Sequence, residues 1–177
     1  MPIISPLSRE HDRTGFDCGV PELNSFLRTT ARQHGNKGIS RTFVLAEPKK
    51  PSFIIGYFTL TLCEVHMEYL PDKYAMKYPA HFLPAVRLAR LAVDLKFQGK
   101  GNGGLLLADA IRRTVLVAEQ AGTIGLFVDA KNDYARQFYE KFGFVALRNH
   151  ILQLFLPLDT LRKALQLRTK KSSFLMV

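Results

Sequence analysis

Residues 86–104 read VRLARLAVDLKFQGKGNGG, and the rest of the chain can be placed around this stretch. Its first part, residues 86–93, is rich in leucine and valine and predicts a buried strand. A turn at residues 94–97 leads to a glycine-rich segment, which opens a helical pattern of leucine and alanine. Glycines let successive backbone N–H groups face one anion, and the helix start adds its positive dipole end. Strand, glycine turn and helix in this order therefore predict a phosphate-binding loop.

The glycine spacing distinguishes between known types of phosphate loop. A P-loop is excluded because no Gly-Lys-Ser/Thr follows the first glycine at the required distance. The dinucleotide pattern G-x-G-x-x-G fits Gly99, Gly101 and Gly104 loosely, but its ribose-binding acid would be Glu119, inside the predicted helix. The pattern Q-x-x-G-x-G fits residues 98–103 and resembles the pyrophosphate loop of the GNAT superfamily of N-acetyltransferases. An ordinary glycine-rich turn between a strand and a helix is the alternative interpretation.

A second motif, N-x-x-A-x-x-F-Y-x-x-x-G-F at residues 132–144, resembles the acetyltransferase helix that lines the thioester. The resemblance implies that Tyr139 protonates the leaving thiolate, since a phenol with a pKa of about 10 stays protonated at neutral pH. Core packing of an amphipathic helix explains Phe138 and Phe142 fully, and helix capping explains Asn132 equally well. Core packing explains Tyr139 less well, because a buried phenol needs a hydrogen-bond partner.

Together the two motifs imply a site for acetyl-coenzyme A. By this resemblance, backbone amides of the glycine loop hold the diphosphate, Lys100 adds positive charge, and the pantetheine arm pairs with the end of the central strand. The implied cofactor-binding residues are Leu91, Ala92, Val93, Gln98, Gly99, Lys100, Gly101, Gly103, Gly104, Asn132, Ala135 and Phe138.

Two further segments narrow the resemblance. Residues 16–28, FDCGVPELNSFLR, and residues 88–94, LARLAVD, are similar to segments of the acetyltransferase toxins of bacterial toxin–antitoxin modules. That resemblance implies transfer of the acetyl group of acetyl-CoA to the α-amine of aminoacyl-tRNA, by direct attack, which blocks translation. It also implies a ribbon–helix–helix antitoxin as partner, contact with DNA only through that antitoxin, and a homodimer. A GNAT enzyme for a small amine or a protein or peptide amino group is the alternative, since it shares every cofactor residue.

The charge of the chain favours an anionic partner. Lysine and arginine number 25 against 15 acidic residues, which gives a net charge of +10. Such an excess is typical of proteins that bind nucleic acid, although charge that merely keeps the protein soluble is the alternative. The candidate tRNA-binding residues are Arg87, Arg90, Lys49, Lys50 and Arg136.

The chemistry expected for the acetyl transfer needs no protein nucleophile. Cys63 and His66 are three residues apart in a predicted strand, which puts them on opposite faces. Glu64 and His66 are candidates for a general base by position, but surface positions are the simpler interpretation. An α-amino group titrates near pH 8, so a charged tRNA can present much of its amine already neutral.

Composition bounds the fold and the compartment. A chain of 177 residues with 47% hydrophobic content predicts a single domain, 1–177. Two cysteines form neither a disulfide framework nor a metal quartet, so we expect reduced thiols, no bound metal and a cytoplasmic protein. The chain shows no signal peptide and no apolar run of about 18 residues, so we expect no membrane contact.

The order of predicted elements gives an α/β fold: a mixed, mostly antiparallel sheet of GNAT type, with a central β-α-β-α core and flanking helices. We expect strands at residues 3–7, 39–47, 52–65 (with a bulge at Gly56), 86–93, 124–129, 144–147 and 151–158. Helices are expected at 21–33, 105–121 and 134–142, and from residue 159 until the basic residues 168–171 end the last one. Residues 68–84 are predicted to form an irregular surface excursion.

Overall fold

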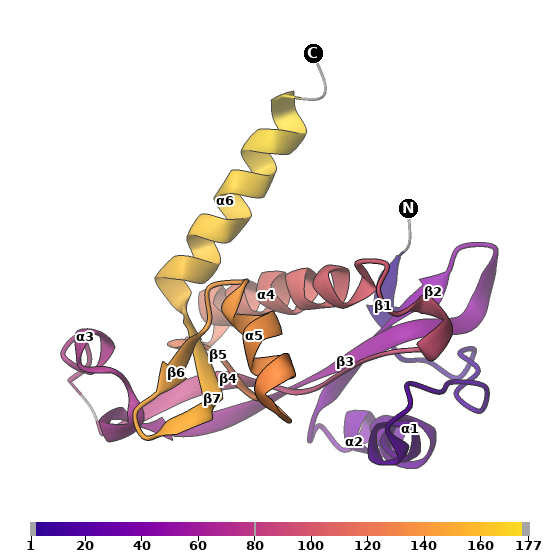
Figure 1. Ribbon diagram of the computed structural model, residues 1–177, viewed down its shortest axis with the longest axis horizontal. Helices are drawn as coiled ribbons and strands as arrows, with labels where there is room; N and C mark the ends of the chain where they lie inside the picture. The colour runs from indigo at the N-terminus through magenta and orange to yellow at the C-terminus, as the bar shows by residue number, and fades with distance from the viewer. Residues whose placement is uncertain (1–2, 80, 175–177) are drawn as a thin grey trace. The chain divides into compact units, whose positions relative to one another are not determined.

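The computed structural model describes residues 3–79 and 81–174, which form a seven-stranded sheet and its helices (Figure 1). In chain order the elements are β1 (Ile4–Pro6), α1 (Pro21–Ser25), η1 (Phe26–Thr30), α2 (Ala31–Asn36), β2 (Arg41–Glu47), β3 (Lys50–His66), η2 (Met67–Tyr69), α3 (Asp72–Ala75), β4 (Phe82–Val93), η3 (Leu95–Phe97), α4 (Asn102–Gln120), β5 (Gly125–Asp129), α5 (Asp133–Glu140), β6 (Val145–Leu147), β7 (His150–Pro157) and α6 (Leu158–Phe174).

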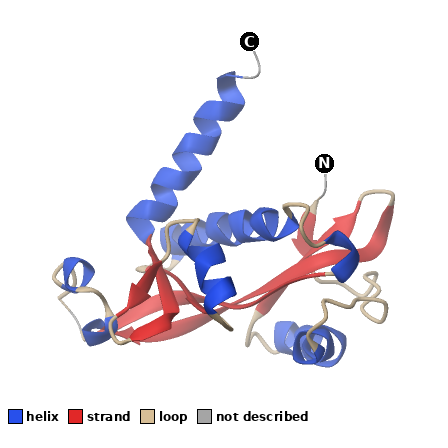
Figure 2. Ribbon diagram, in the orientation of Figure 1, coloured by secondary structure: helices blue, strands red, loops and turns tan. Residues whose placement is uncertain are grey.

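The strands follow the order β1-β2-β3-β4-β5-β7-β6 in the sheet. The pairs β1/β2, β2/β3, β5/β7 and β6/β7 are antiparallel. Helices alternate with the strands in the middle of the chain (Figure 2). This confirms the predicted mixed α/β fold with a mostly antiparallel sheet. Within the described residues, none of the helices has the length and apolar character needed to cross a membrane.

The prediction was wrong in two segments. The expected irregular segment contains η2 and α3, and strand β4 already begins at Phe82. Pro84 fits this strand because it pairs through its carbonyl, which accepts the Ile124 N–H at 2.9 Å. The N–H that proline lacks is not needed for this pairing. Helix α6 also continues past the basic residues to Phe174. Leucine, arginine, lysine and glutamine are strong helix formers, so charge repulsion does not end the helix there.

Contacts within the chain group into two compact units. One unit comprises the chain up to Thr61 together with Leu88–Ala110, and the other comprises Leu62–Arg87 together with the chain from Ile111 onward. Strands β3 and β4 and helix α4 contribute residues to both units. The single-domain organisation stays a prediction.

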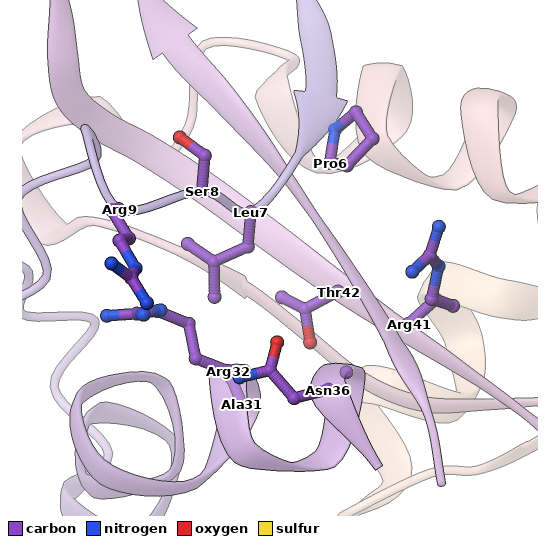
Figure 3. A pocket seen from close by; sticks show the side chains of 10 residues that line it. Pro6, Leu7, Ser8, Arg9, Ala31, Arg32, Asn36, Arg41 and Thr42 are labelled. Carbon is purple, nitrogen blue, oxygen red and sulfur yellow. The ribbon is translucent and has the colours of Figure 1, made fainter. Parts of the chain in front are cut away.

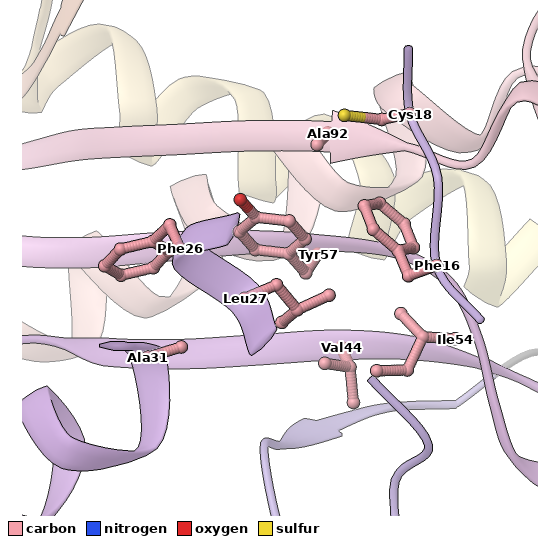
Figure 4. Packing of buried hydrophobic residues seen from close by; sticks show 9 residues of the cluster. All are labelled: Phe16, Cys18, Phe26, Leu27, Ala31, Val44, Ile54, Tyr57 and Ala92. Atoms are coloured by element: carbon pink, nitrogen blue, oxygen red, sulfur yellow. The ribbon is translucent and has the colours of Figure 1, made fainter. Parts of the chain in front are cut away.

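An aromatic cluster forms the core of the first unit (Figure 4). Tyr57 of β3 lies between two phenylalanine rings, with its centroid 5.5 Å from that of Phe16 and 6.4 Å from that of Phe26. The Tyr57 hydroxyl donates to the Leu23 carbonyl at 2.8 Å, so this buried phenol is satisfied. The cluster consists of Phe16, Cys18, Phe26, Leu27, Ala31, Val44, Ile54, Tyr57 and Ala92.

The helical segment at residues 21–36 has a π-helical turn in its middle, η1. The Thr29 hydroxyl donates to the Ser25 carbonyl at 2.9 Å, and the Ala31 N–H bonds to the Phe26 carbonyl five residues back. A side-chain hydroxyl on a backbone carbonyl competes with the regular helical ladder. The widened turn carries Phe26 and Leu27, which are both buried in the core.

Close backbone approach shapes the second unit. A Cβ on Gly125 of β5 would lie 2.3 Å from the Leu156 carbonyl oxygen, so only glycine lets β5 and β7 pair here. The Phe127 and Phe155 rings stack beside this point, with centroids 4.6 Å apart. The core of this unit consists of Val65, Leu70, Leu83, Ala85, Ile124, Phe127, Leu147 and Phe155.

Candidate active site

The glycine loop between η3 and α4 forms an open cradle of backbone amides. Gly99 and Gly101 have positive φ angles of 70° and 81°, the left-handed region that glycine adopts at little cost. Apart from the glycine and its two neighbours in the chain, no atom of the described residues lies within 4 Å of the position that a Cβ would occupy at either glycine. The N–H groups of Gly99, Lys100 and Gly101 find no acceptor among the described residues. The first N–H groups of helix α4, at Asn102 to Gly104, also lack intrahelical partners, so the loop can bind an anion.

A buried carboxylate fixes the entry to this cradle. Asp94, which is 4% exposed, accepts the Lys96 N–H at 3.0 Å with one oxygen and the Asp17 N–H at 3.1 Å with the other. The Leu95 N–H donates to the Asp17 carbonyl at 2.9 Å, so the two segments are joined in both directions. The sequence pattern marks the segment around Asp17 only as a family resemblance and assigns Asp94 no role.

The N-terminal motif makes its own hydrogen-bond network beside Asp94. The Asp17 carboxylate accepts the Gly19 N–H at 2.9 Å and the Asn24 side-chain amide at 2.8 Å. Asn24 in turn accepts the Cys18 N–H at 2.9 Å. These hydrogen bonds lower the pKa of Asp17 below its ordinary value. The motif therefore supports the backbone that leads into the cradle.

Side chains of the cradle face the protein backbone. The Gln98 amide donates to the carbonyls of Val93, at 2.9 Å, and Cys18, at 3.2 Å. The Lys100 ammonium donates to the Lys96 carbonyl at 2.9 Å, and the Asn102 amide donates to the Phe97 carbonyl at 2.8 Å. Gln98 thus locks the loop onto the end of β4, which leaves the backbone amides to meet a ligand. Gly103 and Gly104 lie in the first turn of α4.

A β-bulge in β3 contacts the end of strand β4. The prediction assigns this strand end to the binding of the pantetheine arm. In the β2–β3 register Leu45 pairs with Gly56 and Ala46 with Ile54, so the bulge falls at Ile55, one residue from the predicted position. The bulged residue's carbonyl accepts the Asp94 N–H at 2.8 Å. A Cβ on Gly56 would lie 2.8 Å from the Ala92 carbonyl oxygen. Ala92 is buried, whereas Leu91 and Val93 are half-buried at the strand end.

The second motif forms helix α5 in the other unit. Asn132 caps the helix, because its side-chain oxygen accepts the Ala135 N–H at 2.9 Å. Phe138 is half-buried, with its ring centroid 5.2 Å from those of both Tyr139 and Phe142. The core interpretation was wrong for Phe142, which is 37% exposed. This face of the helix therefore presents aromatic surface.

Tyr139 is a largely buried phenol with a free hydroxyl. The residue is 7% exposed, and its ring packs 5.4 Å from that of Phe144, centroid to centroid. Burial raises the pKa of Tyr139 above its ordinary value. Its hydroxyl has no hydrogen-bond partner among the described residues, yet no described side-chain polar atom is both fully buried and unpartnered. The hydroxyl therefore reaches the surface, where a ligand can meet it.

Most of the predicted RNA-binding cations already have partners. Arg87 forms an ion pair with Asp129 at 2.5 Å, and the Arg90 guanidinium carbon lies 3.6 Å from the centroid of the Phe26 ring. Arg136 bridges two acids of its own helix, Asp133 at 2.9 Å and Glu140 at 2.6 Å. Lys49 and Lys50 are exposed at the β2–β3 turn.

The described residues give little support for catalysis by a protein nucleophile or by a bound metal. Burial raises the pKa of the thiols of Cys18 and Cys63, so neither thiol is activated. Glu64 and His66 are exposed, and His66 contacts Glu68 at 3.8 Å. No three His, Cys, Asp or Glu side chains in the described part of the chain gather into a possible metal site.

Comparison with known proteins shows the family of the chain. Residues 80–157 match the acetyltransferase (GNAT) domain family. The chain is 35% identical over 156 residues to a Mycobacterium tuberculosis protein described as a tRNA-acetylating toxin, with 88% of this chain and 92% of the relative covered.

Two solved structures extend the comparison. AtaT complexed with acetyl-methionyl-tRNAfMet matches with a TM-score of 0.85 and 34% identity, over 92% of this chain and 98% of that one. A tyrosine-to-phenylalanine mutant of AtaT, bound to acetyl-CoA and the C-terminus of the antitoxin AtaR, matches with a TM-score of 0.78 and 29% identity, over 92% and 97%.

The family match and these similar proteins identify the chain as an acyltransferase of the acetyl-CoA-dependent kind. The chain belongs to the GNAT acetyltransferase family.

Proposed function

We propose that this acetyltransferase moves the acetyl group of acetyl-CoA to the α-amino group of an aminoacyl-tRNA and thereby blocks translation. The observation that carries the proposal is the largely buried Tyr139 with its unpartnered, surface-reaching hydroxyl. The relative described as a tRNA-acetylating toxin and the AtaT complex with acetyl-methionyl-tRNAfMet support the choice of acceptor. An acetylated α-amine can no longer act as a nucleophile in peptide bond formation.

The residues divide the chemistry between two tasks. The amides of Gly99 to Gly101 and the first turn of α4 would bind the diphosphate of acetyl-CoA, where fixed dipoles stabilise negative charge without reorganisation. Tyr139 would donate its proton to the leaving sulfur as the amine attacks the thioester carbon and the carbon–sulfur bond breaks. The surplus proton on the attacking nitrogen would then return to the phenolate, directly or through water, and restore the phenol. A raised pKa keeps the phenol protonated over the working pH range. Asn132, Ala135 and Phe138 would line the thioester end of the site.

The proposed reaction also implies partners and a compartment. A chain of this net charge, +10, suits an RNA partner. The AtaT complex with the C-terminus of AtaR supports an antitoxin partner for this chain. We assign that antitoxin to the ribbon–helix–helix type, the toxin to a homodimer, and both to the cytoplasm, where charged tRNA and acetyl-CoA occur together.

Acetyl transfer to tRNA tests the proposal directly. Labelled acetyl-CoA is incubated with the protein and with total tRNA, charged in one sample and deacylated in the other. We expect label only on charged tRNA, and we expect Tyr139→Phe to lose that label while it still binds acetyl-CoA. Label on a polyamine or a peptide amine, with none on charged tRNA, would refute the proposal and favour the small-amine alternative.

A further inference from the structure

A cationic pocket lies in the first unit and shares no lining residue with the glycine cradle. It has a volume of about 200 Å³ and is bounded by the end of β1 with the loop after it, by α2 and by the start of β2 (Figure 3). The lining residues with charged side chains are Arg9, Arg32 and Arg41, and none is acidic.

Among the described residues, no side chain or carbonyl forms an ion pair or a hydrogen bond with the guanidinium groups of these three arginines. In Figure 3 the side chains of Arg9 and Arg32 extend toward the same end of the pocket, while Arg41 lies at its other side. Like charges that line one pocket repel, and an anion bound among them would remove this cost. The charges of Arg87 and Arg136, in contrast, are already balanced, because each of these arginines pairs with an acidic side chain.

Local structure holds the pocket in place. The Leu7 N–H donates to the Thr42 carbonyl at 2.9 Å, which ties the loop to β2. The Ser8 N–H donates to Nδ1 of His11 at 3.0 Å, and burial lowers the pKa of His11, so its ring stays neutral. Ala31 and Thr42 are buried, and Arg32 is half-buried. The pocket is therefore built from ordered parts of the unit.

We propose that this pocket binds phosphate groups of the tRNA backbone, an assignment that rests on the proposed function. Guanidinium groups bind phosphate through paired, charge-assisted hydrogen bonds. One phosphate between Arg9 and Arg32 would give both their missing counter-charge, and the next phosphate of the strand could reach Arg41. Asn36 adds an exposed amide donor. The exposed side chains around the pocket are mostly polar, which suits RNA better than an acidic peptide, whose anchors are apolar as well as charged.

The test measures the affinity of purified full-length protein for charged tRNA as a function of salt concentration. The variants are Arg9→Gln, Arg32→Gln, the double variant and Arg41→Gln. Arg162→Gln is the matched control, because Arg162 is an exposed arginine of the other unit. Binding of acetyl-CoA by every variant shows that the protein is folded.

Each pocket variant should bind charged tRNA several-fold more weakly. The slope of log affinity against log salt should fall by about 0.7–0.9 for each phosphate that a variant no longer binds. Because one phosphate bridges Arg9 and Arg32, the double variant should lose little more than either single variant. The loss of tRNA affinity in Arg41→Gln should add to the loss caused by the Arg9 and Arg32 variants. Arg162→Gln and the affinity for acetyl-CoA should be unchanged.

Several outcomes would overturn the assignment. They are unchanged tRNA affinity in the double variant, an equal loss in Arg162→Gln, a loss of acetyl-CoA affinity alone, and a loss of binding to the antitoxin alone. If the wild type acetylates charged tRNA and the pocket variants match it, the pocket assignment fails and the proposed function stands. If the wild type transfers no acetyl group to charged tRNA, the proposed function itself has failed.

Discussion

The carboxylate of Asp94 accepts the backbone N–H of Asp17 at 3.1 Å and so joins two segments that lie 77 residues apart in the chain. Asp94 directly follows the central strand β4, and Asp17 belongs to the motif near the N-terminus. The second carboxylate oxygen accepts the Lys96 N–H, which starts the turn into the glycine loop. The N-terminal motif therefore supports the backbone that leads into the glycine loop.

Asp94→Ala should destabilise the protein and weaken acetyl-CoA binding together. Removing a buried acceptor leaves two N–H groups unsatisfied, which costs about 1–3 kcal/mol for each buried group left without a partner. Asp94→Asn should lower the free energy of unfolding by less, because the amide oxygen of asparagine still accepts one of the two N–H groups. Urea denaturation gives the free energy of unfolding, and initial rates give the KM for acetyl-CoA.

Asp12→Ala is the control for this prediction. Asp12 also accepts an N–H two residues on, that of Thr14 at 2.9 Å, but it lies outside the cradle. We expect a smaller loss of stability and an unchanged KM for acetyl-CoA. If Asp94→Ala raised this KM no more than Asp12→Ala does, the support role of Asp94 would be wrong.

The glycine loop can be tested with two glycines of matched conformation. Gly101 and Gly122 both have φ of 81° and open space around the missing Cβ. Alanine at either position should cost about 1–2 kcal/mol, because an L-residue is strained in the left-handed region. Only Gly101→Ala should also weaken acetyl-CoA binding, measured by calorimetry, since only Gly101 belongs to the cradle. Equal affinities in the two variants would contradict the cradle assignment.

The sequence predicted backbone features better than side-chain partners. Glycine spacing, strand patterning and the Asn132 cap are local, so the cradle, the bulge near Gly56 and helix α5 could be predicted from short stretches. The catalytic role that the motif implies for Tyr139 stays a prediction. The start of β4 at Phe82 was not predicted, because it depends on pairing with the segment around Ile124, which is distant in the sequence.

Partners across the fold could not be predicted from the sequence in this way. Arg90 was assigned to RNA on the basis of charge, but the folded chain places its guanidinium on the Phe26 ring of a distant helix. Arg9, Arg32 and Arg41 come from three separate elements, so nothing in their spacing indicates that they share a pocket. Charge composition indicates how many cations a chain carries, and only the fold decides which of them lack a partner.

Arg90→Gln should therefore affect stability more than RNA binding. Loss of the contact with Phe26 should lower the free energy of unfolding by about 0.5–2 kcal/mol, the range for cation–π pairs from exposed to desolvated sites. A double-mutant cycle with Phe26→Leu isolates the coupling between the two side chains. The salt dependence of tRNA binding should stay close to that of the wild type. A clear drop in the salt slope would restore the prediction that Arg90 contacts a phosphate.

The pH dependence of turnover separates Tyr139 from the other buried tyrosine. Burial raises the pKa of Tyr139, so the phenol remains protonated from pH 6 to beyond its ordinary value of about 10. The kcat/KM for charged tRNA should therefore rise as the α-amine loses its proton below about pH 8, with no descending limb from Tyr139 up to about pH 10.

Tyr139→Phe should lower kcat by about 10²–10⁴-fold, the usual contribution of a general acid, without changing the position of the rising limb. Tyr57→Phe is the matched control, since burial also raises the pKa of Tyr57, whose hydroxyl donates to the Leu23 carbonyl at 2.8 Å. In this variant the free energy of unfolding should fall by about 0.5–1.5 kcal/mol, while kcat should be unchanged. Full turnover in Tyr139→Phe would refute the general-acid role. A descending limb near pH 8–9 that vanishes in Tyr139→Phe would instead show that the phenol ionises early, against the effect of its burial.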